Sequence, residues 1–409
     1  MIVYDGLKSD FMRSVEGGLI AKEIEQNILD KLGFHTTANE FMSWENSMLR
    51  MYMIMNDSEI PSDAGVAIEY NVPQTAKRID FMISGYGADN KPGMVFVELK
   101  QWQKIEKVEA TDAVVELVET YTGNALRKVV HPSYQAWSYA RLILDYNAIV
   151  QDKDIKLAPC AFLHNYIRRD NDPLDDEQYA EYLYEAPAFT RTQTKELKNF
   201  IKKWIKKGDK KEILYQVDHG KIKPSKSLQN SIASMLDGNQ EFTMIDEQRV
   251  VYEEILKISE RCQKDHKKRT VICKGGPGTG KSVVAVQLLA ELTQRDQVVQ
   301  YVSKNQAPRQ VYLQKLKGKK RLTGVENMFK GSSSYVNVGR NQIHTLIADE
   351  AHRLEERSQY TKKTGNENQI KEIIHSAMCS VFFIDESQRV TMADIGSIDE
   401  IKKWAEFEK

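Results

Sequence analysis

The sequence predicts an α/β protein of two domains, and three observations lead to this prediction. Short β-rich runs alternate with amphipathic helical segments in both halves of the chain. The 409 residues are enough for two or three domains of ~100–200 residues each. Between the halves lies a polar, basic stretch that includes Lys223-Pro-Ser-Lys-Ser227. We therefore expect domains at residues 1–220 and 240–409, joined by a linker at residues 221–239.

The composition is that of a folded globular protein, with 41% hydrophobic and 28% charged residues. Basic and acidic residues both total 58, so the chain has no net charge and any nucleic-acid surface must be a local patch. No apolar run approaches the ~20 residues that cross a bilayer, and the start lacks the features of a signal peptide. The four cysteines lie far apart, which argues against disulfides and a cysteine zinc site. We expect a cytoplasmic protein without a membrane partner.

Helices and strands alternate along the first half of the chain. Apolar residues recur at helical spacing within most of residues 1–60 and again after residue 131, whereas residues 66–100 hold β-rich runs separated by turns. The predicted elements are helices at Ile20–Leu32, Trp44–Met55 and Pro132–Tyr146 and strands at Val66–Tyr70, Arg78–Ile83, Met94–Lys100 and Leu157–Leu163. This order indicates a mixed α/β domain.

The second half shows the regular alternation that is typical of a parallel sheet. A strand, a glycine-rich loop and a helix come first, and strands and helices then alternate. The predicted strands are Val271–Lys274, Val298–Ser303, Thr345–Asp349 and Val381–Asp385.

The glycine-rich loop is a complete phosphate-binding motif. Residues 275–282 match G-x-x-x-x-G-K-[ST], and they connect an apolar strand to a predicted helix at Val283–Leu292. Glycines let successive backbone N–H groups curl around phosphate oxygens, and the helix N-terminus adds positive charge. We expect Lys281 to contact the β- and γ-phosphates of ATP and the Ser282 hydroxyl to bind Mg²⁺. The other predicted ATP-binding residues of the loop are Gly275, Gly276, Gly278, Thr279 and Gly280.

Two adjacent acids end the third predicted strand of this half. In Thr345-Leu-Ile-Ala-Asp349-Glu350-Ala-His352, strand geometry places both acids at the sheet edge that holds the glycine loop. We expect Asp349 to bind Mg²⁺ and Glu350 to orient and deprotonate the water that attacks ATP.

Three more polar residues extend this pattern and carry a family resemblance. Asp385 and Gln388 follow the fourth strand, and Gln248 precedes the helix that leads to the glycine loop. With the two nucleotide motifs, they resemble superfamily 1 helicases over residues 240–409. The resemblance implies a RecA-like domain in which Gln248 contacts adenine, Asp385 and Gln388 form the D-x-x-Q element, and Tyr301–Asn305 contact a single strand.

The resemblance also implies a second RecA-like domain, which supplies arginine fingers worth ~10³–10⁵ in rate. The chain ends at Lys409, soon after the fourth predicted strand. We therefore expect the second domain to be absent here, with arginines supplied by a second chain or a missing C-terminal domain. This polypeptide alone should then bind ATP but hydrolyse it and translocate poorly.

A second acidic centre is predicted in the first half. Alternation along a strand puts Glu98 and Lys100 on one face, where Asp80 of the neighbouring strand can meet Glu98. Two carboxylates suit Mg²⁺, with Mn²⁺ as an alternative, and such a metal activates water for attack on a phosphodiester. Lys100 would steady the phosphate or the water. The competing interpretation, surface residues of a half-exposed hairpin, is weakened because Glu98 and Lys100 interrupt a very apolar run.

Gln135 and Tyr139 share one helix face downstream and add a second resemblance. The set resembles the RecB-like branch of PD-(D/E)xK nucleases, of the restriction-endonuclease type, whose helix carries this Gln and Tyr near the metal. Ile79 stands where that family expects proline. Glu45 is our prediction for the additional acid that some members bring. The lysines of the amphipathic segment Lys195–Lys207 form either a solvated face or a phosphate-contacting patch beside this site.

Together, the two halves resemble a bacterial family of nuclease–helicase fusions with a Schlafen-like P-loop domain, some of whose members defend against phage. The first-half motifs that carry this resemblance are Glu69-Tyr70 with Pro73, Lys77–Asp80, Glu98–Trp102 and His131–Gln135. The resemblance implies an ATP- and Mg²⁺-dependent nuclease–helicase that acts on single- or double-stranded DNA. Two alternatives stay open: a nucleotide-gated nuclease or switch without unwinding, and a nuclease directed at RNA.

Overall fold

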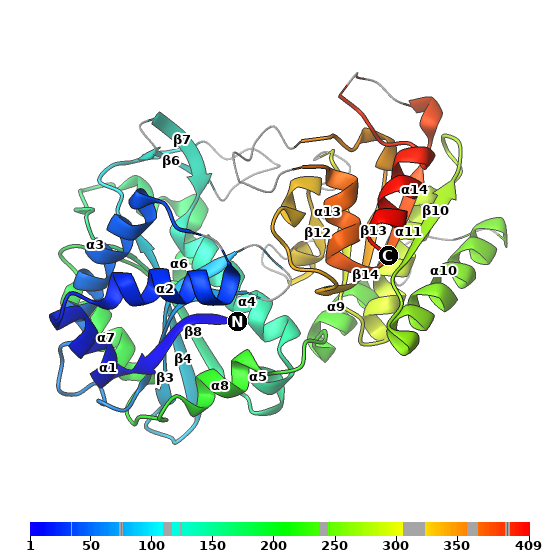
Figure 1. Cartoon of the computed structure of the whole chain (residues 1–409). Helices are drawn as coiled ribbons and strands as arrows, with labels where there is room; N and C mark the ends of the chain where they lie inside the picture. Colours follow the sequence, from blue (N-terminus) through cyan, green and yellow to red (C-terminus); the bar gives the residue numbers. More distant parts are fainter. Residues whose placement is uncertain are drawn as a thin grey trace. The chain divides into compact units, whose positions relative to one another are not determined.

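A computed structural model of the chain confirms the α/β class and divides the chain into two compact units (Figure 1). Unit 1 comprises Met1–Val72 and Lys77–Lys221, and unit 2 comprises Pro73–Ala76 and Ile222–Lys409. The residues that the structure describes are 1–33, 35–72, 75, 77–108, 117–122, 125–236, 244, 246–305, 324–357, 367–388, 391 and 393–409. Pro73 and the predicted boundary at residues 239–240 lie outside them.

Unit 1 is built on a mixed sheet of order β1–β2–β3–β4–β8–β9. Strands β1 to β4 pair antiparallel, whereas β8 and β9 extend the sheet parallel to β4. The strands are β1 (Ile2–Leu7), β2 (Gly65–Asn71), β3 (Arg78–Tyr86), β4 (Pro92–Lys100), β8 (Lys156–Leu163) and β9 (Ala188–Thr190). The four strands predicted from the sequence form the centre of the sheet, and β1 adds an edge in a segment predicted as mostly helical.

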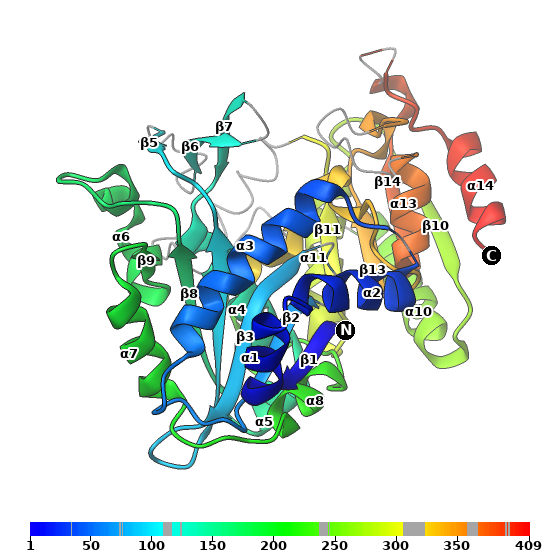
Figure 2. The same ribbon diagram turned by 60° about the vertical axis from the view of Figure 1, so that its left-hand side comes forward.

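Helices cover both faces of this sheet (Figure 2). The helices are α1 (Lys8–Glu16), α2 (Ile20–Leu32), α3 (Ala38–Met55), α4 (Pro132–Tyr146), α5 (Ala148–Asp152), α6 (Ala180–Glu185), α7 (Thr194–Trp204) and α8 (Glu212–Asp218). Helices α1, α2, α3 and α7 enclose the main apolar core with one face of the strands, which buries Phe81 and Val97 completely. Helix α4 packs against β4 and β8 from the other face. The side chains of β3 and β4 that alternate with this core therefore face α4.

Helix α7 is the amphipathic segment that the sequence predicts at Lys195–Lys207. Its apolar residues Leu197 and Ile201 are fully buried in the main core. On the polar face, Lys202 pairs with Asp57 at 3.3 Å and with Glu59 at 3.2 Å. At least this lysine therefore already has protein carboxylates as partners.

A small antiparallel sheet of order β5–β6–β7 stands apart from the main sheet of unit 1. It consists of β5 (Ile105–Lys107), β6 (Leu117–Thr122) and β7 (Ala125–Val130), and the sequence pattern did not reveal it. Figure 2 shows β6 and β7 as a hairpin that projects from the rest of the unit.

Unit 2 is built on a parallel sheet of order β10–β14–β13–β11–β12, which confirms the predicted parallel arrangement. The strands are β10 (Arg269–Lys274), β11 (Val299–Val302), β12 (Phe329–Lys330), β13 (Ile343–Ala348) and β14 (Ala377–Ile384). The helices are α9 (Lys226–Leu236), α10 (Asp246–Asp265), α11 (Lys281–Gln294), α13 (Gln369–Ser376) and α14 (Ile398–Phe407). Because all strands run in parallel, the residues that follow β10, β11, β13 and β14 gather at one sheet edge.

Residues 226–236 of the predicted linker are not a loose connection. They form α9, which packs against α11 and buries Leu228 and Ile232. The side-chain amide of Gln229 donates to the carbonyl of Thr293 at 3.0 Å. The polar residues suggested a linker, but the apolar residues at helical spacing decide the structure. Among the described residues, no helix has the length and apolarity to cross a membrane.

Candidate active sites

The glycine loop of unit 2 connects the end of β10 to the first turn of α11. Gly278 and Gly280 have φ angles of 74° and 77°, which glycine adopts without a steric penalty. Helix α11 begins at Lys281, whose Nζ donates hydrogen bonds to the carbonyl oxygens of Gly275 (2.8 Å) and Gly276 (2.6 Å). The ammonium group and the N-terminus of α11 therefore lie at the curl of the loop. This arrangement is the one that anion binding requires.

Ser282 and Asp349, the two residues predicted to bind Mg²⁺ in unit 2, are hydrogen-bonded to each other. The Ser282 hydroxyl donates to Oδ2 of the buried Asp349 at 2.5 Å. Asp349 also accepts hydrogen bonds from the Tyr301 hydroxyl at 2.7 Å and from the backbone N–H of Glu350 at 2.9 Å. These bonds hold the carboxylate at the end of β13, beside the first turn of α11. Its oxygen chemistry and position fit the Mg²⁺ of a bound nucleotide.

Glu350, the predicted base, has an unusual backbone conformation. Its φ angle of 51° lies in the left-handed region, which is uncommon for a residue with a side chain. The side-chain amide of Asn305 donates to Oε2 of Glu350 at 2.8 Å. The turn after β13 thus presents Asp349 and Glu350 in succession, each held by its own hydrogen bonds. A strained residue held this firmly is typical of functional sites.

The other predicted nucleotide-binding residues flank the loop. Gln388 and Ser387 each donate a side-chain hydrogen bond of 2.6 Å to Asp385, at the end of β14. The hydrogen bonds from Ser387 and Gln388 lower the pKa of Asp385 and keep it ionised. Gln248 donates to the carbonyl oxygen of Thr279 at 2.9 Å, within the glycine loop. Unit 2 therefore brings the predicted residues together at one sheet edge.

The segment Tyr301–Asn305 does not fit a single-strand contact at its first residue. Tyr301 is fully buried, and its hydroxyl binds Asp349. Lys304 forms ion pairs with Glu355 at 2.9 Å and with Asp394 at 3.1 Å. Tyr301 therefore positions the carboxylate of Asp349 at the end of β13, a role that the sequence did not suggest.

Asp80 and Glu98 of unit 1 lie side by side on the face of the sheet that α4 covers. The antiparallel register that pairs Phe81 with Val97 brings them to the same level on β3 and β4. Glu98 is only 2% exposed, and its charge acts on the neighbouring Asp80 carboxyl. Oδ2 of Asp80 also accepts a hydrogen bond of 2.7 Å from the backbone N–H of Leu99.

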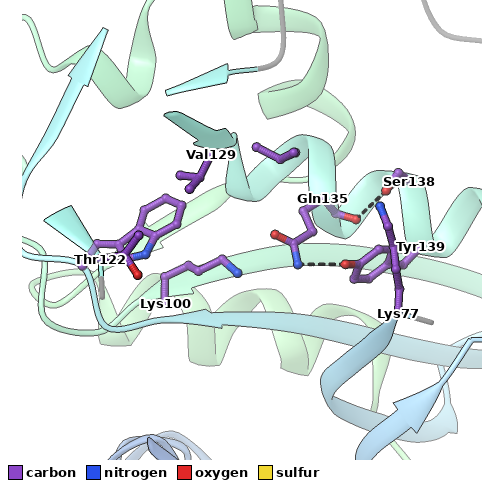
Figure 3. A pocket seen from close by; sticks show the side chains of 9 residues that line it. Lys77, Lys100, Thr122, Val129, Gln135, Ser138 and Tyr139 are labelled. Carbon is purple, nitrogen blue, oxygen red and sulfur yellow. Dashed lines mark hydrogen bonds between the residues drawn. The ribbon is translucent and has the colours of Figure 1, made fainter. Parts of the chain in front are cut away.

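Lys100 and Gln135 complete this cluster by binding one oxygen of Glu98. Lys100 Nζ and Gln135 Nε2 each lie 2.6 Å from Oε1 of Glu98. Gln135 also donates to the hydroxyl of Tyr139 at 2.8 Å, and Figure 3 shows Lys100 and Gln135 extending toward each other. Oε2 of Glu98 is buried and receives no hydrogen bond from an N–H or O–H of the described residues. The structure thus brings together all four residues predicted for this centre.

Because this cluster is shielded from water, unbalanced charges within it cost free energy. Burial, followed by the charge of Glu98, raises the pKa of Asp80 well above its ordinary value. Burial opposes the charge of Lys100, but the carboxylates of Glu98 and Asp80 outweigh it and raise the lysine pKa. Burial and the same carboxylates also raise the pKa of Tyr139. Since one ammonium group cannot balance the buried carboxylate of Glu98 and the half-buried carboxylate of Asp80, the cluster requires a further proton or a cation.

The donor set of this centre fits a magnesium ion better than a structural metal. Mg²⁺ keeps several waters and takes one or two protein carboxylates together with substrate phosphate oxygens. Asp80 and Glu98 offer two carboxylates, and the orphaned Oε2 of Glu98 offers a free acceptor. Across the described parts of the chain, no three His, Cys, Asp or Glu side chains cluster as a metal site. A closed zinc site, which needs four such ligands, is therefore not formed by these residues.

Glu69 is an acid that lies near Asp80, whereas Glu45, the acid predicted from the sequence, is exposed on α3. Glu69 is half-buried on β2 and has a left-handed φ of 55°. Glu69 accepts hydrogen bonds from Trp44 at 2.9 Å and Arg78 at 3.1 Å. Burial and the charge of Asp80 raise the pKa of Glu69, so the two acids interact. The sequence placed Glu69 in a family-like segment but carried no signal for this role.

Comparison with known families gives a match within the second half of the chain. Residues 268–409 match the family model described as Schlafen group 3, DNA/RNA helicase domain. The match covers the glycine loop, the acidic turn and the Asp385–Gln388 segment. No curated protein and no solved structure matches the chain. Residues 268–409 of unit 2 are therefore similar to a Schlafen helicase domain, and this similarity suggests an NTP-hydrolysing function related to nucleic acids.

Proposed function

We propose that the chain is an ATP- and Mg²⁺-dependent DNA nuclease–helicase. Unit 1 would be a PD-(D/E)xK nuclease, and unit 2 would be the first RecA-like domain of a superfamily 1 helicase. The observation that carries the nuclease is the pair of half-buried Asp80 and buried Glu98, with Lys100 2.6 Å from Glu98. Such a charge arrangement costs stability, and proteins keep it where it serves a reaction.

In the nuclease, Asp80 and Glu98 would hold Mg²⁺, with Mn²⁺ as an alternative. The metal would supply a Lewis acid and an activated water for attack on the scissile phosphate. Lys100, held by Glu98, would stabilise the negative charge that develops on the phosphate. Gln135 orients Glu98 through its hydrogen bond of 2.6 Å, and Tyr139 in turn positions Gln135.

In the helicase domain, Lys281 and the loop N–H groups would bind the phosphates of ATP. Ser282 and Asp349 would hold its Mg²⁺, and Glu350 would orient and deprotonate the attacking water. The family resemblance implies that Gln248 contacts the adenine of ATP. It also implies that Asp385 and Gln388 lie near the γ-phosphate. Arginine fingers would come from a second RecA-like domain or from a second chain. A role in phage defence is a prediction of the family resemblance, and a cytoplasmic location is a prediction from the cysteine usage and the start of the sequence.

The test is cleavage of labelled single- and double-stranded DNA and RNA by the full chain, with and without Mg²⁺ and ATP. We expect Mg²⁺-dependent cleavage of DNA that Asp80→Asn abolishes, because the metal loses one of two carboxylates. The matched control is Asp89→Asn, since Asp89 is exposed in the turn between β3 and β4.

The outcomes separate the alternatives. Cleavage of RNA but not DNA would establish the RNA-directed nuclease, and ATP-stimulated cleavage without strand separation would establish the nucleotide-gated form. If Asp80→Asn cleaves as fast as the wild type, the acidic pair is not a nuclease centre. ATP hydrolysis without cleavage of any substrate would leave a helicase-type ATPase alone.

A further inference from the structure

We propose that the pocket beside the acidic pair of unit 1 receives one unpaired nucleobase of the substrate strand, stacked on Trp102. This inference rests on the proposed nuclease function and specifies its substrate class. The enzyme would cut single-stranded nucleic acid, or unpaired segments of a duplex, in preference to fully paired duplex.

The pocket has the size and composition of a small-ligand site. Its volume is about 480 Å³, within the ~300–1,000 Å³ that is usual for such sites. Residues from α4, from the end of β4 and from the β6–β7 hairpin line it (Figure 3). The lining residues are Lys77, Lys100, Trp102, Thr122, Val129, Val130, Gln135, Ser138 and Tyr139.

The pocket adjoins the acidic pair through shared residues. Lys100 and Gln135 line the pocket, and both bind Oε1 of Glu98. Lys100 Nζ also lies 5.5 Å from the centroid of the Trp102 ring. One side chain therefore connects the aromatic surface to the carboxylates. A base on Trp102 would place its own backbone phosphate next to the proposed metal.

The chemistry of the walls fits a base with its phosphate. Trp102 is only partly buried, and Val129 adds apolar surface opposite the polar wall of α4. Ser138 and Gln135 offer hydrogen-bonding groups to a base edge. Lys77 Nζ lies 5.4 Å from the Tyr139 ring centroid and adds a second positive charge to the pocket. The ammonium groups of Lys77 and Lys100 suit a phosphodiester and do not suit a cationic or purely apolar ligand.

Stacking in such a pocket favours single strands over duplex. An aromatic side chain stacks on any base, so binding tolerates sequence variation. A paired base is already stacked within its helix and must leave the helix to enter a concave pocket. A duplex has this energetic cost, whereas a single strand does not, because its bases are unpaired. The predicted choice between strand types therefore arises from Trp102 rather than from the metal.

The first experiment maps contacts without requiring cleavage. Single-stranded DNA and RNA that carry 5-iodouracil are photo-crosslinked to the full chain in EDTA, and the crosslinked peptide is identified by mass spectrometry. We expect a crosslink at Trp102 with at least one of the two strands. Crosslinks confined to residues outside the pocket would overturn the proposal, even if the chain proves to be a nuclease.

The second experiment measures cleavage by Trp102→Ala and Trp102→Phe. We expect Trp102→Ala to raise KM for the single strand about tenfold, the usual size of one base–aromatic stack, with kcat little changed. Trp102→Phe should retain most of the affinity, and Tyr184→Ala is the control because Tyr184 is an 86% exposed aromatic on α6. An abasic nucleotide beside the cut bond should slow the wild type but not Trp102→Ala.

Two results would contradict the pocket in this second experiment. One is an unchanged KM of Trp102→Ala for the single strand, with the circular dichroism spectrum confirming that the variant is folded. The other is an equal loss on single strand and duplex. Failure of the wild type to cut any substrate would instead contradict the nuclease itself, while the crosslinks still decide what occupies the pocket.

Discussion

Asp80 lies in an electrostatically unfavourable environment in unit 1, because burial and the charge of Glu98 both raise its pKa. It is half-buried beside Glu98, and Lys100 is the cation that the two carboxyls share. Replacing such a cluster by neutral groups commonly leaves a protein as stable or makes it more stable. Proteins keep destabilising groups of this kind where they act on a substrate. The same residue should therefore limit stability and enable the reaction.

We predict that Asp80→Asn stabilises the metal-free protein, by about 2–4 °C in Tm. Burial and Glu98 raise the pKa of Asp80 from an ordinary value of 3.8, so the folded state holds a proton that the unfolded state has lost. Stability therefore falls as the pH rises from 3.8 toward the raised value. The advantage of the variant should grow between about pH 5 and about pH 8. Differential scanning calorimetry in EDTA measures it.

Metal addition is the control for this prediction. We expect Mg²⁺ to bind the native state alone and to raise the Tm of the wild type at neutral pH, whereas Asp80→Asn should gain little. Asp89→Asn should follow the wild type at every pH, because Asp89 is exposed. A lower Tm for metal-free Asp80→Asn at every pH would show that the carboxylate stabilises the fold.

The first turn of α11 shows how an element depends on one glycine. Gly280 has a φ of 77°, and a Cβ there would lie 2.0 Å from Nε2 of Gln248. We predict that Gly280→Ala destabilises the nucleotide-free protein by about 1–2 kcal/mol, the usual cost of a left-handed residue with a side chain. The denaturant midpoint should fall with an unchanged m-value.

Gly276→Ala is the matched control within the same loop. The nearest atom to a Cβ at Gly276 is Cγ2 of Thr279, at 4.0 Å, so the added methyl group fits. Its stability should stay close to that of the wild type. Equal destabilisation by both substitutions would mean that the loop tolerates neither alanine and that the left-handed turn is not the cause.

Elements with strong periodicity could be predicted from the sequence, and elements that depend on distant partners could not. The predicted bounds of α2 and α4 agree with the structure, because their apolar faces lie on long local patterns. Strand β1 was missed because its place is set by pairing with β2, more than fifty residues away. The β5–β7 sheet was missed because its strands are short and partly exposed. Tertiary pairing decides such segments.

The residues of the candidate sites also divide into those that could be predicted from the sequence and those that could not. Residues at fixed offsets in a motif, such as Lys281 and Ser282, could be predicted because the chemistry requires their spacing. Glu69 and Tyr301 could not be predicted in this way. Only the fold brings Glu69 close to Asp80 and the Tyr301 hydroxyl to Asp349. Trp102 ends the motif Glu98–Trp102, and only the structure shows that it is partly exposed in a pocket. Side-chain surroundings, rather than residue identity, separate these cases.

At the scale of the whole molecule, two acidic centres lie in separate units. The carboxylates of Asp80 and Glu98 belong to unit 1, and those of Asp349 and Glu350 belong to unit 2. Each centre has its own cations and hydrogen bonds within its unit. Substitution in one unit should therefore leave the intrinsic chemistry of the other intact.

This separation predicts the behaviour of Lys281→Ala in the full chain. The variant should lose ATP binding, because it lacks the cation at the curl of the glycine loop. Its ATP-free, Mg²⁺-dependent cleavage should equal that of the ATP-free wild type, and stimulation by ATP should disappear. Fluorescent-nucleotide titration and cleavage rates with and without ATP measure the two effects. Lys264→Ala, an exposed lysine on α10, is the control and should behave as the wild type in both assays.

The ratio of rates with and without ATP then measures how far the nucleotide controls the nuclease. A ratio above one in the wild type that falls to one in Lys281→Ala places the control in the glycine loop. Loss of ATP-free cleavage in a correctly folded Lys281→Ala protein would contradict the independence of the two centres. The nuclease would then require the intact loop itself rather than bound nucleotide, and the two units would have to act as one site.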